Sequence, residues 1–276
     1  MADGLDTFDD WVGRAQQSQG ILTEELVDRF CATLEIADNN SGHLPLGIHW
    51  CVGLDSPATS ALGSDGHPPK GGFLPPVPFP RRMWASGQMT VLSPLRRNQT
   101  LTRQSRITAV TPKQGKSGNL CFVTVRHTIL ADDRPAIDEE QHIVYRDAAN
   151  GDAPDPLPAE DPAPLSAGVR RLWPTETLLF RYSALTFNSH RIHYDQSYAR
   201  DAESYPALVV HGPLQATLLA DRAYQALGRP LTRFAFAGRA PAFVGAALDL
   251  GVEAVGPPLG LASRQFGKIC MTAEAA

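Results

Sequence analysis

Residues 182–199 read Tyr-Ser-Ala-Leu-Thr-Phe-Asn-Ser-His-Arg-Ile-His-Tyr-Asp-Gln-Ser-Tyr-Ala, and this stretch decides how the rest of the chain is interpreted. Residues 176–187 predict a strand, because they are rich in aromatic and β-branched residues and contain no breaker. The polar residues that follow, from Asn188 to Asp195, predict a loop that carries two imidazoles. Histidine titrates near neutral pH, so this loop is a candidate for proton transfer.

The composition is that of a globular protein that neither binds nucleic acid nor spans a membrane. The chain has 276 residues, of which 43% are hydrophobic and 20% charged, and its formal net charge is -4. A nucleic-acid binder would usually carry a basic face, and the sequence has no apolar run of membrane-spanning length. The acidic N-terminus argues against a signal or transit peptide, and the four cysteines predict buried thiols. We therefore expect a cytoplasmic protein.

The first half predicts one helix followed by strands. Residues 21–36 predict the helix, because apolar side chains recur every four residues from Leu22 and Thr23 can cap its start. Residues 46–54 predict a second helix or a strand. The Pro- and Gly-rich residues 55–80 predict a long loop, and loops of that length are usually functional or disordered. Strands are expected at 99–111, 119–131 and 141–146, with a turn at 113–118.

The second half repeats this order after a Pro-rich acidic linker. The linker at 151–168 predicts a domain boundary between an N-terminal domain, 1–150, and a C-terminal domain, 169–276. A helix is expected at 213–227, with Gly228 just past its end, and strands at 231–240, 246–255 and 259–272. Helices followed by long antiparallel strands indicate an α+β fold in which the sheet wraps the helix.

Two features suggest the chemistry. Pro213 has no N–H, so the nearest donor at this helix start is the backbone N–H of Gly212. That N–H either stabilises a developing oxyanion or belongs to a glycine chosen only for its backbone shape. His193 lies five residues after Asn188, and an imidazole and a carboxamide at this spacing can hold one water between them. Water addition to an activated double bond needs little more than these groups.

The segment 186–199 resembles the hydratase-2 motif of the MaoC-like hot-dog dehydratases, which reads roughly Ser-Gly-Asp-x-Asn-Pro-(Leu/Ile)-His-x-Asp-Pro-x-x-Ala. Asn188 stands at the position of the catalytic Asp and His193 at that of the catalytic His. Residues 210–214, Val-His-Gly-Pro-Leu, look like the family's strand-to-helix turn, whose Gly N–H forms the oxyanion hole. The resemblance implies a double hot-dog fold: two antiparallel sheets, each wrapping a long helix, are paired within one chain, and only the C-terminal half carries the motif.

The variant Phe-Asn-x-His-Arg-Ile-His-Tyr-Asp, together with Pro-Arg-Arg-Met-Trp-Ala at 80–85, is similar to a narrower branch. That branch contains the mesaconyl-C4-CoA and itaconyl-CoA hydratases and the type 2 hydroxyacyl-thioester dehydratases. The resemblance implies a hydro-lyase acting on an enoyl-CoA, with a C4–C5 dicarboxylyl group favoured. It implies no cofactor, because coenzyme A is part of the substrate. The alternatives are a (3R)-hydroxyacyl-thioester dehydratase of fatty acyl chains and a non-catalytic acyl-CoA-binding subunit. A homodimer is plausible.

The motif departs from the family at two places. Asn188 cannot take a proton from water, so we expect the acid/base role to fall mainly on His193, with Asn188 orienting the water or the imidazole. Asp195 is the alternative base. Arg191 replaces the family's Pro, and it either pairs with a substrate carboxylate or forms a salt bridge with Asp195.

The remaining candidate residues bind substrate or coenzyme A. Arg82 and Trp84 lie in an Arg-rich segment that is suited to binding a phosphate or a carboxylate. The alternative is that Arg82 is simply a solvated surface residue and Trp84 a packed one. Arg239 is expected to bind coenzyme A and His211 to contact the substrate. The histidines of the motif do not predict a metal site, because zinc usually needs three or four converging ligands and this hydration needs no metal.

Overall fold

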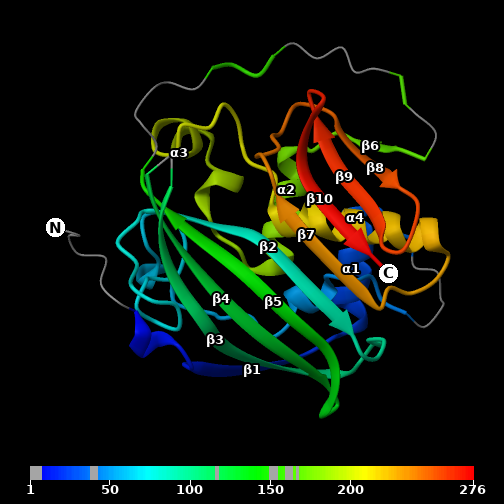
Figure 1. Ribbon diagram of the computed structural model, residues 1–276, viewed down its shortest axis with the longest axis horizontal. Coiled ribbons are helices and arrows are strands. Elements are labelled where there is room, and N and C mark those ends of the chain that lie inside the picture. The colour runs from blue at the N-terminus through cyan, green and yellow to red at the C-terminus, as the bar shows by residue number, and fades with distance from the viewer. Residues whose placement is uncertain (1–7, 38–42, 116–117, 149–154, 159–163, 166–167) are drawn as a thin grey trace.

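The computed structural model describes residues 8–37, 43–115, 118–148, 155–158, 164–165 and 168–276. Within them the strands form one antiparallel ten-stranded sheet in the order β1-β3-β4-β5-β2-β7-β10-β9-β8-β6. Figure 1 shows the strands of the two halves meeting where β2 lies beside β7. The strands are β1 Ala15–Ile21, β2 Arg81–Val91, β3 Thr100–Gly115, β4 Gly118–Ala131, β5 Arg134–Arg146, β6 Arg170–Leu172, β7 Arg233–Gly238, β8 Leu248–Ala254, β9 Leu259–Gln265 and β10 Lys268–Ala275.

The predicted strands are mostly confirmed, with four differences apart from residues 176–187. The residues of β4 alternate between buried and more exposed, as the sequence pattern predicts. Residues 259–272 were predicted as one strand, but they belong to the hairpin β9–β10. The chain reverses at Phe266 and Gly267, which both have positive φ, at 51° and 71°. The short strand β6, the N-terminal strand β1 and most of β2 were not predicted.

Two helices form where the sequence predicts them. Helix α1, Glu24–Leu34, is capped by Thr23, whose hydroxyl accepts a hydrogen bond from the Leu26 N–H at 3.1 Å. Helix α4, Gly212–Leu227, ends at Gly228 in the left-handed conformation. Residues 46–54, which were left open between helix and strand, contain only a short 3-10 turn at Ile48–Cys51.

The prediction of a strand at 176–187 is wrong, because Glu176–Thr186 is helix α2. Thr175 caps it, with its hydroxyl accepting from the Leu178 N–H. Its buried residues, Leu179, Tyr182 and Leu185, recur every three positions and so form one helical face that packs near α1. Tertiary burial of this face outweighs the strand preference of its aromatic and β-branched residues.

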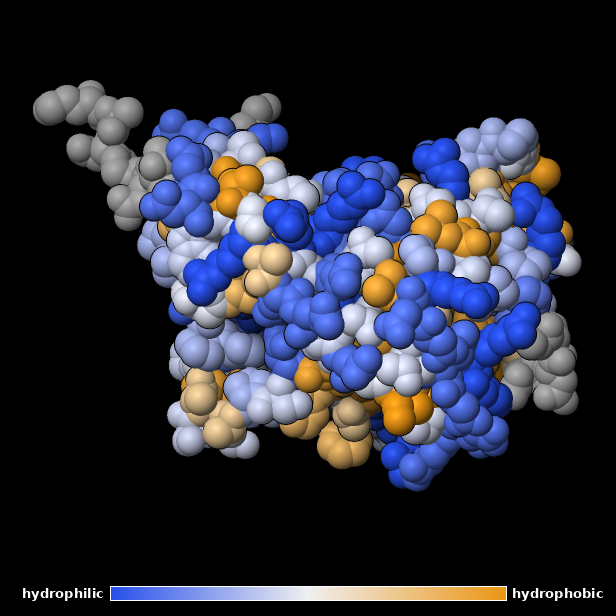
Figure 2. Space-filling view, turned by 90° about the horizontal axis from the view of Figure 1, so that it is seen from below, coloured by the Kyte–Doolittle hydropathy of each residue, from blue (hydrophilic) through white to orange (hydrophobic). Residues whose placement is uncertain are grey.

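The helices of both halves share one hydrophobic core, which includes Phe30 of α1, Tyr182 of α2, Leu214 of α4 and Phe234 of β7. The four cysteines are buried and form no disulfide with one another, as expected. Within the described residues no helix is long and apolar enough to cross a membrane. The face seen in Figure 2 is mostly polar, with scattered apolar patches. The domain boundary at 151–168 stays a prediction, and much of that segment lies outside the described residues.

A buried carboxylate ties the N-terminal strands to the 3-10 turn at Ile48–Cys51. Glu139 of β5 accepts hydrogen bonds from Trp50 Nε1 at 2.8 Å and Gln141 Nε2 at 2.9 Å, and its other oxygen lies 3.2 Å from His49 Nε2. Burial alone raises the pKa of Glu139, but the hydrogen bond and charge interaction with His49 and the nearby His127 lower it to about 2. The ionised form of Glu139 is therefore the one that stabilises the fold.

Replacing Glu139 by Gln should lower the free energy of unfolding by about 3 kcal/mol at pH 7. The folded pKa is depressed below the ordinary value of 4.5, so the stabilisation is present above pH 4.5 and fades as the pH falls toward about 2. Urea denaturation at pH 7, 5 and 3.5 measures this. The difference between wild type and Glu139→Gln should narrow at pH 3.5. Glu140→Gln, on the more exposed side of β5, is the control and should change stability by less than about 0.5 kcal/mol. A difference that does not vary with pH would contradict the assignment.

Candidate active site

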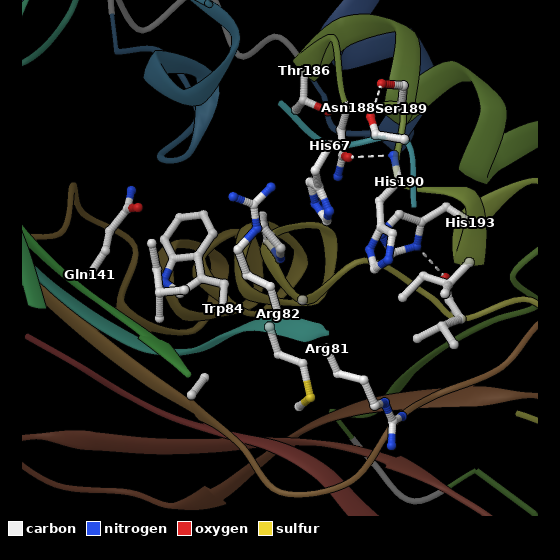
Figure 3. A pocket seen from close by; sticks show the side chains of 18 of the residues that line it. His67, Arg81, Arg82, Trp84, Gln141, Thr186, Asn188, Ser189, His190 and His193 are labelled. Atoms are coloured by element: carbon white, nitrogen blue, oxygen red, sulfur yellow. Dashed lines mark hydrogen bonds between the residues drawn. The ribbon is translucent and has the colours of Figure 1, made fainter. Parts of the chain in front are cut away.

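A cavity of about 1170 Å³ lies where the loop 53–74, the start of β2, the motif loop and the start of α4 meet. Figure 3 shows the side chains that project into it. The predicted functional loop at 55–80 supplies several of these residues, as do the polar faces of β1, β3, β4 and β5. The cavity therefore draws on both halves of the chain.

The motif loop begins where α2 ends at Phe187, which has a φ of 49°. The N–H of Asn188 donates to the Ser183 carbonyl at 2.9 Å, which turns the chain toward the cavity. The side-chain oxygen of Asn188 accepts a hydrogen bond from the His190 N–H at 3.0 Å, so one end of the carboxamide stabilises its own loop. Asn188 lines the cavity, and its amide nitrogen is free to donate there.

His193 lines the cavity in a fixed tautomer. Its Nδ1 lies 2.7 Å from the Val209 carbonyl oxygen, which can only accept, so Nδ1 carries the proton and Nε2 is unprotonated. Burial lowers the pKa of His193 to about 4, and the Val209 hydrogen bond only partly offsets this. The ring is therefore neutral at pH 7 and offers Nε2 as a hydrogen-bond acceptor or base.

His211 does not line the cavity, so its predicted contact with substrate is not supported. Its ring stacks on that of His193 with centroids 3.6 Å apart, and its Nε2 lies 2.8 Å from Ser183 Oγ. His211 thus packs against the His193 ring on the side away from the cavity. The next residue, Gly212, begins α4 and does line the cavity. Its N–H belongs to the first turn, where no intrahelical acceptor exists, as the oxyanion role requires.

Arg191 and Asp195 bind each other and do not line the cavity. The guanidinium of Arg191 donates to Asp195 Oδ2 at 2.7 and 3.1 Å and lies over the ring of Tyr198. Asp195 also caps the short helix α3, Gln196–Asp201, through the Tyr198 N–H. Of the two alternatives for Arg191, the structure shows the salt bridge. It supports neither substrate binding by Arg191 nor the base role of Asp195.

The other predicted binding residues lie on the cavity wall. Arg82 points into its centre, whereas its neighbour Arg81 turns away and forms a buried ion pair with Glu203 at 2.7 Å. Arg82 makes no ion pair with any described residue. Trp84 also lines the cavity, with its ring packed edge-on against Phe236. Arg239 is exposed at the rim, where its Nε donates to Thr272.

The sequence interpretation missed a second pair of residues at the cavity: His67, which lines it, and Asp65, which binds His67. Asp65 Oδ2 lies 2.9 Å from His67 Nδ1, and Asp65 Oδ1 accepts from the His67 backbone N–H at 3.0 Å. The ring of His67 lies 4.1 Å from that of His190, which in turn lies 5.6 Å from that of His193. Only the long loop around this pair was recognised, because nothing in its local pattern shows what it faces.

The segment 64–67 is held directly on the motif loop. The Arg191 N–H donates to the Asp65 carbonyl at 2.9 Å, the Arg191 side chain donates to the Ser64 carbonyl, and Ser189 donates to the Gly66 carbonyl. Gly66 has a φ of +85°, and a Cβ at this position would lie 1.9 Å from the Ser189 carbonyl oxygen. The close approach of the two loops therefore requires glycine here.

The imidazoles of the cavity are all held neutral. Burial, together with the neighbouring His67 and His193, lowers the pKa of His190 to about 2. Burial also lowers the pKa of His67, against the opposing effect of Asp65. Neutral imidazoles can accept protons, so the cavity is equipped for base catalysis at neutral pH.

The far end of the cavity is polar as well. Arg103, Ser105, His127 and Gln141 line it from the faces of β3, β4 and β5. Burial lowers the pKa of Arg103, and its charge is balanced by the nearby Glu139. An extended apolar channel, which a fatty acyl chain would need, is thus interrupted by buried polar groups.

Comparison with known proteins agrees with this geometry. The family described as hydroxyacyl-thioester dehydratase type 2 matches residues 47–244, which is most of the chain. The chain belongs to this family. It is 44% identical over 236 residues to a mesaconyl-C(4)-CoA hydratase from Chloroflexus aurantiacus, covering 84% of each protein.

Solved structures show the same fold. A MaoC-like dehydratase has a TM-score of 0.72 at 14% identity, covering 98% of this chain and 99% of that one. A Mycobacterium tuberculosis protein described as a double hot dog has a TM-score of 0.56 at 14% identity, covering 96% and 95%. The fold is therefore the expected α+β double hot dog, and by its family the chain is a hydro-lyase of the enoyl-thioester type.

Gly66→Ala should abolish most activity, because the added methyl cannot fit against the Ser189 carbonyl and must push the two loops apart. We expect kcat/KM to fall at least ~100-fold, since a displacement of about 1 Å at a catalytic site has this effect. Gly71→Ala is the matched control: Gly71 has a similar φ of +87°, but its nearest contact to an added Cβ is at 3.7 Å. Equal losses in the two variants would show that backbone strain, and not the contact between loops, is responsible.

Proposed function

We propose that the protein hydrates an enoyl-CoA whose β-carbon carries a carboxylate, with mesaconyl-C4-CoA as the leading substrate. The observation that carries this proposal is Arg82, a cavity-lining guanidinium with no ion pair among the described residues. Its charge acts on His67, whose ring contacts His190 of the motif loop. The 44% identity to a hydratase of that name supports the same substrate.

The chemistry of mesaconyl-C4-CoA explains why this position matters. The thioester is at C4, so the methyl group and the free carboxylate are both attached to the β-carbon that receives the hydroxyl. A group that recognises the carboxylate must therefore lie within the catalytic cluster, and not at the far end of a channel. Arg82 meets that requirement, and a guanidinium binds a carboxylate through two parallel hydrogen bonds.

We propose that the water is held by Asn188 and His193, while the Gly212 N–H binds the thioester oxygen. As the new C–O bond forms at the β-carbon, the π electrons move through the α-carbon to the thioester oxygen and give an enolate. One proton of the water passes to a neutral imidazole and is then delivered to the α-carbon. His193, at the motif's histidine position, is one such imidazole, and no further cofactor is required.

Coenzyme A itself is proposed to enter past the rim, where Arg239 is exposed and can meet a phosphate. Trp84, on the wall beside Arg82, packs against the acyl portion. We also propose the cytoplasm as the location, and pairing of two copies as a homodimer, which light scattering of the purified protein would test.

The alternative function is a (3R)-hydroxyacyl-thioester dehydratase of fatty acyl chains, in line with the description of the family. The buried polar groups around Arg103 count against a long alkyl chain in this cavity. A non-catalytic binding subunit is disfavoured because His193 and Gly212 both face the cavity.

Loss of the enoyl-thioester absorbance should be seen when the protein meets mesaconyl-C4-CoA, and more weakly with crotonyl-CoA. His193→Ala should reduce kcat at least ~100-fold with each substrate, because a positioned imidazole typically contributes that much. If no thioester loses its absorbance although all bind, the protein is a binding subunit. If long-chain enoyl-CoA is hydrated fastest, the fatty acyl alternative is correct.

Arg82→Gln should separate recognition of the carboxylate from catalysis. We expect kcat/KM for mesaconyl-C4-CoA to fall about 100-fold or more, since a charge-assisted pair is lost in a buried site. The same variant should not lower kcat/KM for crotonyl-CoA, which has no carboxylate to lose its partner. Arg239→Gln, at the rim, is the comparison and should raise KM for both thioesters alike. A parallel loss for both substrates in Arg82→Gln would remove the residue from carboxylate recognition.

A further inference from the structure

The family motif places a carboxylate where this chain has Asn188, so one charged group of the usual pair is missing from the motif loop. A water that adds to the double bond has two O–H bonds, and one of them must break. An acceptor for that proton has to face the cavity, be unprotonated and be stabilised once it becomes charged.

His193 meets the first two conditions but not the third. Its Nδ1–H donates to a neutral carbonyl, that of Val209, and its ring is stacked on the buried and uncharged His211. No carboxylate forms an ion pair with His193 among the described residues. A positive charge on His193 would therefore be poorly compensated, and burial disfavours it.

His67 meets all three conditions. Its Nδ1 lies 2.9 Å from Asp65 Oδ2, so the proton is on Nδ1 and Nε2 is left as the acceptor. His67 lines the cavity and faces Arg82 and His190 there. Asp65 is mostly shielded from solvent, so its negative charge acts strongly on a proton placed on His67. This is a carboxylate-backed imidazole of the kind that serves as a general base.

We propose, on the basis of the function proposed above, that His67 backed by Asp65 is the second catalytic imidazole of the hydration. The breaking O–H bond of the water gives its proton to His67 Nε2 while the oxygen bonds to the β-carbon. His193 Nε2 accepts a hydrogen bond from the other O–H, which remains as the hydroxyl of the product. The imidazolium of His67 then returns its proton to the α-carbon, the enolate collapses to the thioester, and both rings are neutral again.

This assignment gives a reason for the contact between the loops. The segment 64–67 is bound to residues 189–191 by hydrogen bonds from both the backbone and the side chain of Arg191. The same contacts fix Asp65 through its own carbonyl group. The N-terminal half, which lacks the motif, thereby supplies the carboxylate that Asn188 cannot.

The substrate's own charge strengthens the base. The charged and titratable groups around His67 are Asp65 on its own loop, Arg82 on β2, and His190 and His193 on the motif loop. Of these, the positive charge of Arg82 opposes protonation of His67. A bound carboxylate that pairs with Arg82 cancels that effect, so the dicarboxylyl substrate also makes His67 a better proton acceptor.

A cation held by the same residues is the competing explanation. One ligand atom each from Asp65, His67 and His190 lies within 4.8 Å of the others. Both oxygens of Asp65, however, already accept hydrogen bonds from the two N–H groups of His67. That arrangement favours the dyad, because a cation would have to displace the ring N–H.

The test compares His67→Gln and Asp65→Asn with wild type, using mesaconyl-C4-CoA and a pH–rate profile. We expect kcat to fall about 100-fold or more in His67→Gln, with KM changed only a few-fold. Asn at 65 has one acceptor oxygen where Asp has two, so Asp65→Asn removes the charge together with one of the two hydrogen bonds that His67 donates. Its acid limb of kcat/KM should move to lower pH, with a lower plateau, because the neutral neighbour makes His67 a weaker base.

His142→Gln and Asp138→Asn are the matched controls, because both residues lie on β5 outside the cavity. Wild-type rates in His67→Gln, or an unmoved acid limb in Asp65→Asn, would overturn the assignment and leave His193 as the base. Stoichiometric metal in the purified protein, with activity lost on chelation, would also overturn it in favour of the cation.

If wild type hydrates none of the thioesters, the proposed function fails instead, which is a separate result. Circular dichroism and the melting temperature show whether each variant is folded.

Discussion

The pairing of β2 with β7 is the interaction on which the rest of the structure depends. Five residues of β2, from Ser86 to Thr90, pair in antiparallel register with five residues of β7, from Ala237 back to Arg233. This ladder joins the two halves into one sheet. It also brings the first residues of β2 beside the start of α4, where a Cβ on Gly212 would lie 3.7 Å from the Trp84 carbonyl oxygen. The proposed oxyanion donor, Gly212, and the proposed carboxylate receptor, Arg82, are neighbours because two strand edges pair.

The second constraint is the burial of a cluster of imidazoles beside Arg82. This cavity-lining guanidinium forms no ion pair with a described residue, and its charge acts on both Asp65 and His67. Burial keeps the rings neutral, which makes them acceptors, and it strengthens every charge interaction inside the cavity. A substrate that brings a carboxylate completes the charge balance, whereas an alkyl chain leaves Arg82 unpaired. Selectivity for a dicarboxylyl thioester then follows from electrostatics as much as from shape.

The sequence was sufficient for features that are encoded locally. Thr23 and Gly228 mark helix ends, and the spacing of Asn188, His193 and Gly212 identified the site through a motif. It was insufficient where tertiary contacts decide. Helix α2 has the composition of a strand, and only burial against the core makes it helical.

Side-chain direction also could not be predicted. Arg191 and His211 belong to the motif region, but the turns around them point Arg191 at Asp195 and place His211 behind His193. Asp65 and His67 lie more than a hundred residues before the motif, so no local pattern could show that they complete it. Their loop attracted notice only through its proline and glycine content.

The most direct test of the account is a crystal structure with the saturated analogue of mesaconyl-C4-CoA, which binds but cannot be hydrated. The account predicts the thioester oxygen within hydrogen-bond distance of the Gly212 N–H and the free carboxylate on Arg82. The β-carbon should then lie beside a water that contacts both His193 and His67. A carboxylate bound at Arg103 or left in solvent at the rim, with His67 remote from the β-carbon, would contradict it.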